Sequence, residues 1–225
     1  MTRAGFHESL ERIELELLSM GELAGRSVQR AVESIVERDE TKAQAVIDAD
    51  DAIDDLYLQI DQEILQLLAL QSPVAADLRL ISAMLHSCLH LERVGDQAVN
   101  VAKLYLATKD EPGSQTMRQQ LAEMGEVVVR MLRTAMEAFE RRNLELCLTL
   151  PAMDDPVDRL NRSTHLEALK LADDPQSLDW GLHMNMAARA LERVGDNAVD
   201  IGEQVGFLLT GEFREFTDAS HPVDV

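Results

Sequence analysis

An eleven-residue motif occurs twice in the chain, at residues 91–101 and 191–201, with eight of its eleven positions identical. The first copy carries Glu92 and Asp96, and the second carries Glu192 and Asp196. Residues four apart lie on the same face of an α-helix, so each copy places two carboxylates side by side. One further turn along the same face, the first copy has Asn100 and the second has Asp200. The motif therefore predicts a line of oxygen ligands on each of two helices.

A second acidic pair precedes each motif. Asp50 and Asp54 are four residues apart, and an offset of 104 residues leads to Asp154 and Asp158. Like charges at this spacing destabilise a helix by a few tenths of a kcal/mol, roughly, unless a cation lies between them. If neighbouring helices pack antiparallel, the pairs converge into a groove that suits Mg²⁺, Mn²⁺ or Ca²⁺, with iron or zinc also possible. The predicted metal ligands are Asp50, Asp54, Glu92, Asp96, Asn100, Asp154, Asp158, Glu192, Asp196 and Asp200.

The alternative is that these acids form solvated helix faces, and the second copy is the weaker candidate for a metal site. Arg189 stands where the first copy has Leu89, and it could neutralise Glu192 without metal. Pro151 and Pro156 are expected to interrupt the helix around Asp154 and to turn its side chain elsewhere. His86 and His90 are four residues apart, but they project away from the acidic line. They are therefore not predicted to be ligands.

Apolar periodicity predicts three long helices in each half of the chain. The expected helices run over about 6–38, 39–70, 73–108, 116–142, from 143 onward, and 174–210. The paired motifs are offset by 104 residues early in each half and by 100 later, so the halves differ by a deletion between helices. We expect an all-α fold of two tandem three-helix bundles related by an internal repeat. The expected divisions are residues 1–110, 111–216 and a loose tail at 217–225.

Composition limits the classes of partner. The 225-residue chain has a formal net charge of −20, which disfavours direct binding of nucleic acid and favours cations or basic protein surfaces. Cys88 and Cys147 lie in apolar helical patterns and are predicted to be core residues of a reducing compartment. We find no signal-peptide pattern and no apolar run long enough to span a bilayer. The expected location is the cytoplasm.

The motifs of common enzyme classes are missing from the sequence. It has no Gly-rich phosphate loop, no GxSxG and no HExxH, and no catalytic residue is predicted. Di-iron carboxylate enzymes also place acids on bundle helices, but they use a Glu-x-x-His motif that does not occur here. A metal-dependent carboxylate enzyme is therefore the weaker alternative, together with a metal-free helical adaptor.

The two LERVGD motifs resemble those of the PhoU family of phosphate-uptake regulators. The resemblance extends to residues 6–8, 17–21, 71–79 and 211–214, and so covers nearly the whole chain. It implies tandem three-helix bundles, often dimeric, with acidic motifs that bind metal ions or clusters in some members. It also implies a non-catalytic regulator that links a phosphate ABC transporter (ATPase and permease) to a membrane sensor histidine kinase and restrains the phosphate-starvation response.

Overall fold

The computed structural model describes residues 3–216, which form α-helices joined by short connections and contain no strand. The helices are α1 (Arg3–Glu37), α2 (Glu40–Asp48), α3 (Asp51–Leu70), α4 (Ala76–Ala107), α5 (Gln115–Arg141), α6 (Leu144–Leu169) and α7 (Pro175–Thr210). The predicted tail from Thr217 lies outside the described residues. No helix in the described part is both long and apolar enough to cross a bilayer.

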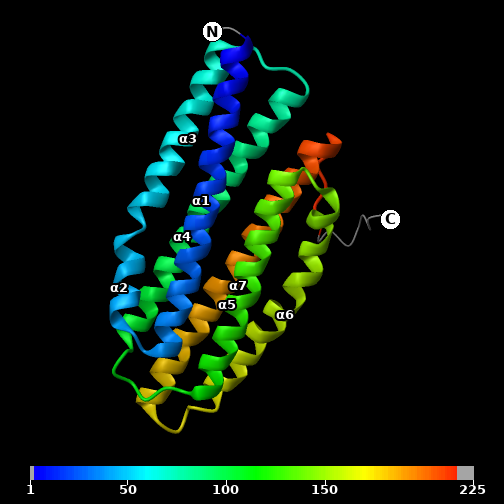
Figure 1. Cartoon of the computed structure of the whole chain (residues 1–225). Coiled ribbons are helices and arrows are strands. Elements are labelled where there is room, and N and C mark those ends of the chain that lie inside the picture. Colours follow the sequence, from blue (N-terminus) through cyan, green and yellow to red (C-terminus); the bar gives the residue numbers. More distant parts are fainter. Residues whose placement is uncertain (1–2, 217–225) are drawn as a thin grey trace.

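The helices form two bundles that lie side by side (Figure 1). The first contains α1, α4 and the consecutive helices α2 and α3, and the second contains α5, α6 and α7. The bundles meet along α1 and α5 and, most extensively, along α4 and α7. Helices α2, α3 and α6 lie on the outside of this central four-helix seam (Figure 1). The predicted all-α fold of two tandem three-helix bundles is confirmed.

The contacts between α1 and α5 show how the two repeats are related. A Cβ atom on Gly21 would lie 2.9 Å from Met136 Cγ, and one on Gly125 would lie 2.8 Å from Val32 Cγ2. An offset of 104 residues converts the first contact into the second, so the two repeats pack about a pseudo-two-fold axis. The glycines allow α1 and α5 to approach closely at both contacts.

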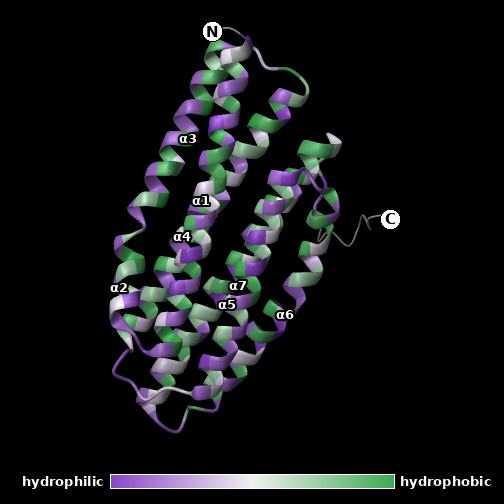
Figure 2. Ribbon diagram, viewed as in Figure 1, coloured by the Kyte–Doolittle hydropathy of each residue, from purple (hydrophilic) through white to green (hydrophobic). Residues whose placement is uncertain are grey.

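The hydrophobic core runs through both bundles and across the seam between them. Each helix alternates between apolar and polar residues around its circumference, as Figure 2 shows. Cys88 and Cys147 are free and buried, as predicted, and burial raises the pKa of the Cys88 thiol to about 12 and that of Cys147 to about 11. Both thiols therefore stay protonated at neutral pH.

The predicted helix boundaries are largely confirmed by their capping groups. The Asp39 carboxylate accepts hydrogen bonds from the backbone N–H groups of Thr41 and Lys42, and Asn143 caps α6 in the same way. Asp174 caps α7, and Gly211 ends it with a left-handed backbone at φ 77°. The prediction that the third helix begins near Pro73 was wrong, because α4 begins at Ala76.

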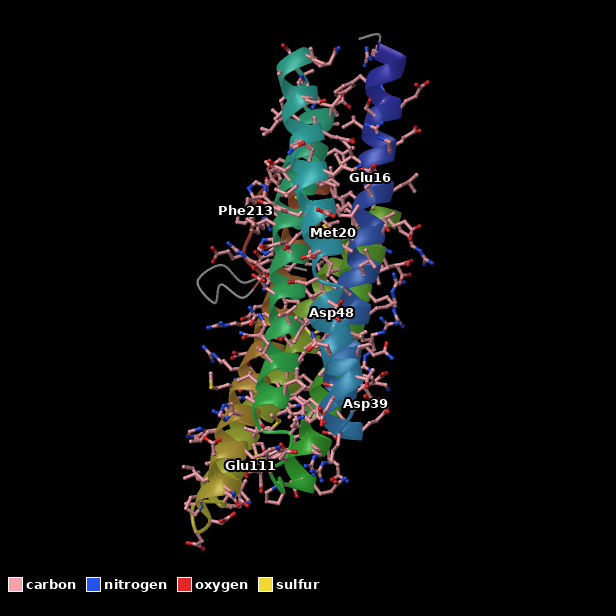
Figure 3. The ribbon with its side chains drawn as sticks, turned by 90° about the vertical axis from the view of Figure 1, so that its left-hand side faces the viewer. Glu16, Met20, Asp39, Asp48, Glu111 and Phe213 are labelled. Carbon is pink, nitrogen blue, oxygen red and sulfur yellow. The ribbon has the colours of Figure 1, made fainter. Side chains whose placement is uncertain are left out.

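The prediction of one continuous helix over 39–70 was also wrong. The helix is interrupted at Ala49 and Asp50, where α2 ends and α3 begins. Figure 3 shows Asp39 and Asp48 at the two ends of the short helix α2. The interruption lies within the acidic segment 48–55, where Asp is a poor helix former and like charges repel one another.

The prolines of the second bundle do not have the predicted effect. Helix α6 continues from Leu144 to Leu169 through both Pro151 and Pro156. Leu150 and Val157, on either side of the prolines, are fully buried. Tertiary packing against α5 and α7 therefore keeps this segment helical despite the hydrogen bonds that the prolines cannot make. As a result, Asp154 keeps its position on the inner face of α6.

Candidate metal centre

The structure brings four of the predicted ligands of the first repeat together at the α3–α4 seam. We call Asp50, Asp54, Glu92 and Asp96 the first acidic cluster. Burial raises the pKa of Asp50, and the charges of Asp54 and Asp96 raise it further. Burial and the charges of Asp96 and Asp54 likewise raise the pKa of Glu92. The carboxylates are thus close enough to repel one another, as the predicted antiparallel packing of their helices requires.

The second acidic cluster consists of Asp154, Asp158, Glu192 and Asp196, at the seam between α6 and α7. Burial raises the pKa of Asp154 to about 7, with further contributions from Asp196, Asp158 and Glu192. Burial also raises the pKa of Asp196. The Oδ1 atom of Asp154 is buried and has no hydrogen-bond partner. This is an unfavourable arrangement for an ionised carboxylate, and a proton or a cation would relieve it.

A glycine in each motif gives the neighbouring acid its space. A Cβ atom on Gly95 would lie 3.0 Å from Ile53 Cδ1 and 3.3 Å from Asp50 Oδ1, whereas one on Gly195 would lie only 2.6 Å from Asp154 Oδ1. The distance at Gly195 is too short for any residue other than glycine unless the carboxylate moves. Gly195 therefore lets the Asp154 carboxylate of α6 rest directly on the backbone of α7, whereas Gly95 makes room for Ile53 as well as for Asp50.

The last predicted ligand of each motif has a different environment in the two repeats. Asn100 is exposed on α4, whereas Asp200 faces α4 across the seam between the bundles, with its Oδ2 atom 3.4 Å from His90 Nδ1. His90 Nδ1 also lies 2.8 Å from Asn197 Oδ1, and Asn197 Nδ2 donates to the Arg193 carbonyl. The amide orientation makes Nδ1 the donor, so His90 joins the two repeats. The spacing of His90 along its own helix gave no indication of this contact.

The prediction that Arg189 pairs with Glu192 is confirmed, because Arg189 Nη1 lies 3.0 Å from Glu192 Oε2. A second pair was not predicted: Arg162 Nη1 lies 3.4 Å from Asp158 Oδ2. The two residues are four apart on α6, a spacing that favours such a pair and that was present in the sequence.

Both clusters have the chemistry that a hard cation requires. Their donors are carboxylate oxygens alone, the class that Mg²⁺, Mn²⁺ and Ca²⁺ prefer. The unpartnered Oδ1 of Asp154 fits a bound ion. Within residues 3–216, however, no three His, Cys, Asp or Glu side chains stand close enough together to hold an ion in their present orientations. Metal binding would therefore need side-chain movement in these clusters.

Comparison with known proteins gives a consistent result. The PhoU domain family model matches the chain at residues 17–105 and again at 121–205. A phosphate-specific transport system accessory protein PhoU homolog from Pseudomonas putida is 34% identical over 217 residues, which cover 96% of this chain and 83% of the relative.

Two solved structures extend the likeness to three dimensions. The crystal structure of PhoU from Pseudomonas aeruginosa is similar with a TM-score of 0.87 and 34% identity, covering 92% of this chain and 100% of the other. The crystal structure of the phosphate transport system regulatory protein PhoU from Streptococcus pneumoniae is similar with a TM-score of 0.84 and 27% identity. It covers 93% of this chain and 99% of the other. With a family domain matched in each repeat and both acidic motifs inside the matched segments, the chain belongs to the PhoU family.

Proposed function

We propose that this chain is a non-catalytic, cytoplasmic regulator of phosphate uptake that couples a phosphate ABC transporter to a sensor histidine kinase. The observation that carries the proposal is the family match over both repeats, together with relatives named as accessory or regulatory proteins of phosphate transport. The strongly negative chain favours basic surfaces on those partners. The proposal includes a homodimer and divides the chain into bundles at residues 1–110 and 111–216.

The proposal assigns metal ions to the two acidic clusters. Mg²⁺, Mn²⁺, iron or zinc would neutralise carboxylates that now raise one another's pKa, and would join α3 to α4 and α6 to α7. Because an ion bound only by the folded state stabilises that state, metal would favour one arrangement of each bundle. The regulatory output would then be protein binding by a metal-stabilised bundle.

Complementation tests the regulatory role. In a strain that lacks its own PhoU and carries a phosphate-starvation reporter, we expect this chain to restore repression of the reporter in phosphate-rich medium. The vector alone serves as the negative control, and immunoblotting verifies expression. A well-expressed chain that left the reporter fully active would argue against the proposed regulation, provided that the strain's own PhoU restores repression from the same vector.

Removing the central acids of the first cluster tests the metal assignment separately. We expect Glu92→Ala with Asp96→Ala to lower metal stoichiometry and weaken binding, because two of the four carboxylates are lost. The helical content should be unchanged, since Asp96 is exposed and Glu92 only partly buried. Elemental mass spectrometry and circular dichroism measure the two effects. Unchanged stoichiometry in the folded double variant would show that the metal lies elsewhere.

A further inference from the structure

The chain that follows α7 turns back onto its own bundle. We call residues 211–216, which begin where α7 ends, the tail strap, and it runs back along the helix (Figure 1). The Phe216 N–H donates to Glu203 Oε1 at 2.7 Å. At the turn, the Glu212 N–H donates to the Thr210 hydroxyl at 3.1 Å. Both ends of the tail strap are therefore attached to α7.

The Phe216 side chain fills a slot between α6 and α7. A Cβ atom on Gly206 would lie 3.3 Å from Phe216 Cζ, and one on Gly202 would lie 3.6 Å from Phe216 Cε2. Leu144 and Leu150 of α6 lie beside the same two glycines. The glycines thus form the floor of the slot and the leucines one of its walls, and we call this site the aromatic slot.

The first repeat carries its own side chains at the positions of these glycines. The offset of 100 residues places Ala102 at the position of Gly202 and Leu106 at that of Gly206. Ala102 is buried, and Leu106 is partly buried against the core. In the second repeat, Phe216 supplies from a separate segment the apolar group that the first repeat has on its own helix. A group supplied by a separate segment can be exchanged for another.

The tail strap fits the aromatic slot in shape but not in charge. Glu203 is only 6% exposed, and burial raises the pKa of its carboxyl, with further increases from Asp200 and Glu215. The hydrogen bond from the Phe216 N–H counteracts this rise in the pKa. Glu215 belongs to the tail strap itself, so the strap brings a like charge toward a buried carboxylate.

We propose that the aromatic slot is a docking site for a basic, aromatic segment of a partner protein, and that the tail strap covers the slot until such a segment displaces it. An aromatic side chain of the partner would replace Phe216 between α6 and α7. A lysine or arginine next to it would lie near Glu203 and Asp200, where the strap places Glu215. The partner would thus replace a repulsion by an attraction.

This exchange leaves the rest of the fold in place. Helices α6 and α7 pack against each other and against α5, so release of the tail strap uncovers the slot without separating them. The slot requires neither bound metal nor the regulatory role proposed above.

Peptide binding to the full chain tests the proposed docking site. The probe is an amidated, fluorescein-labelled peptide of residues 210–216 that carries Glu215→Lys, and fluorescence anisotropy measures its Kd at pH 8 and low ionic strength. Phe216→Ala should bind the probe at least about tenfold more tightly than the wild type, because the wild-type slot is open only while its own strap is away.

The charge preference is tested with a second peptide, which keeps the original Glu215. Phe216→Ala should bind it at least about tenfold more weakly than the probe, because this peptide brings an acid toward Glu203 and Asp200. The difference should shrink as salt is added. In Phe216→Ala with Glu203→Gln, the two peptides should bind with more similar affinity.

Matched variants separate the slot from the overall negative charge of the chain. A probe with Phe216→Ala keeps its lysine and should lose binding. In the protein, adding Gly206→Leu to Phe216→Ala should abolish binding of the probe, because leucine would fill the slot as Leu106 does in the first repeat. Gly206→Ala in the same background is the smaller change, and it should weaken binding in part. Circular dichroism verifies that each variant is folded.

Each contrary outcome removes a defined part of the inference. Equal affinity of the wild type and Phe216→Ala would show that the tail strap does not cover the slot. Failure of Phe216→Ala to bind the probe, or binding that survives loss of the peptide's phenylalanine, would overturn the docking site. Equal affinity for the two peptides would overturn the preference for a basic partner. None of these results depends on metal content or on complementation.

Discussion

In the presence of chelator at pH 8, Asp154→Asn is expected to raise the free energy of unfolding by about 2 kcal/mol. Asp154 lies at the α6–α7 seam with one buried, unpartnered oxygen against Gly195, and burial raises its pKa to about 7. Asn keeps the shape of the side chain and removes the charge. A substitution in the core of a candidate site would thus stabilise the metal-free protein.

The direction of this change in the free energy of unfolding, and the pH range over which it occurs, follow from proton binding by Asp154. Between about pH 4 and pH 7 the folded state holds a proton on Asp154 that the unfolded state has released. Stability from this group is therefore lost as the pH rises through that range, and the loss is complete above pH 7. A shift to about 7 corresponds to about 4 kcal/mol at a fully buried position. Solvent reaches part of this side chain, which reduces the effect to about half.

Chemical denaturation at several pH values measures the effect. The increase in the free energy of unfolding caused by Asp154→Asn should fall to less than about half of its pH 8 value when the pH is lowered to 5. Asp50→Asn is the matched control in the first repeat, where Gly95 leaves more space around the carboxylate, and it should give a smaller gain at pH 8. An equal gain at pH 5 and pH 8 would show that ionisation of Asp154 is not the cause. At saturating metal the wild type should instead be more stable than Asp154→Asn, because Asp154 would then act as a metal ligand, a role that Asn fills poorly.

Trp180→Ala is expected to have the largest effect on stability, a loss of about 3–5 kcal/mol. Trp180 is buried near the start of α7, and the Arg118 guanidinium lies over its ring at 5.0 Å from the centroid. Arg118 also donates to the Pro112 carbonyl, and Gly113, with φ 65°, packs against the indole. The single tryptophan thus fixes the connection between the two repeats to the base of the second bundle.

Denaturation followed by far-ultraviolet circular dichroism measures this loss, because the variant lacks the tryptophan fluorophore. Trp180→Phe is the control, and it should cost less because it retains an aromatic face for Arg118. The predicted loss is a large fraction of the stability of a typical domain, so the transition should move to clearly lower denaturant concentration. A midpoint within error of the wild type would contradict the packing role assigned to Trp180.

Local sequence patterns predicted most of the helical architecture. The caps Asp39, Asn143 and Asp174 and the stop at Gly211 act through neighbouring backbone groups, so short-range chemistry is enough to locate them. The pairing of Arg189 with Glu192 was also predictable, because the two residues are one turn apart on one helix. The acidic clusters followed from the internal repeat once the helices were assumed to pack antiparallel.

At two points where prediction from the sequence failed, contacts between distant segments decided the outcome. Pro151 and Pro156 predicted a break, but burial of Leu150 and Val157 against α5 and α7 keeps α6 continuous and Asp154 in place. His90 contacts Asn197 only because the pseudo-two-fold arrangement brings α4 against α7. Ala190 stands at the corresponding position of the second repeat, and Gln97 Oε1, the counterpart of the Asn197 oxygen, is buried without a hydrogen-bond partner.

The amino-acid sequence by itself determined the helices, the repeat and the set of acids that lie on common faces, because these depend on periodicity and on interactions within a few residues. Only the tertiary structure decided which carboxylates are buried and which face the other repeat. Burial and contacts across the seam arise from packing between helices far apart in the chain, and they give Asp154 its raised pKa and place Asp200 beside His90 of the other repeat.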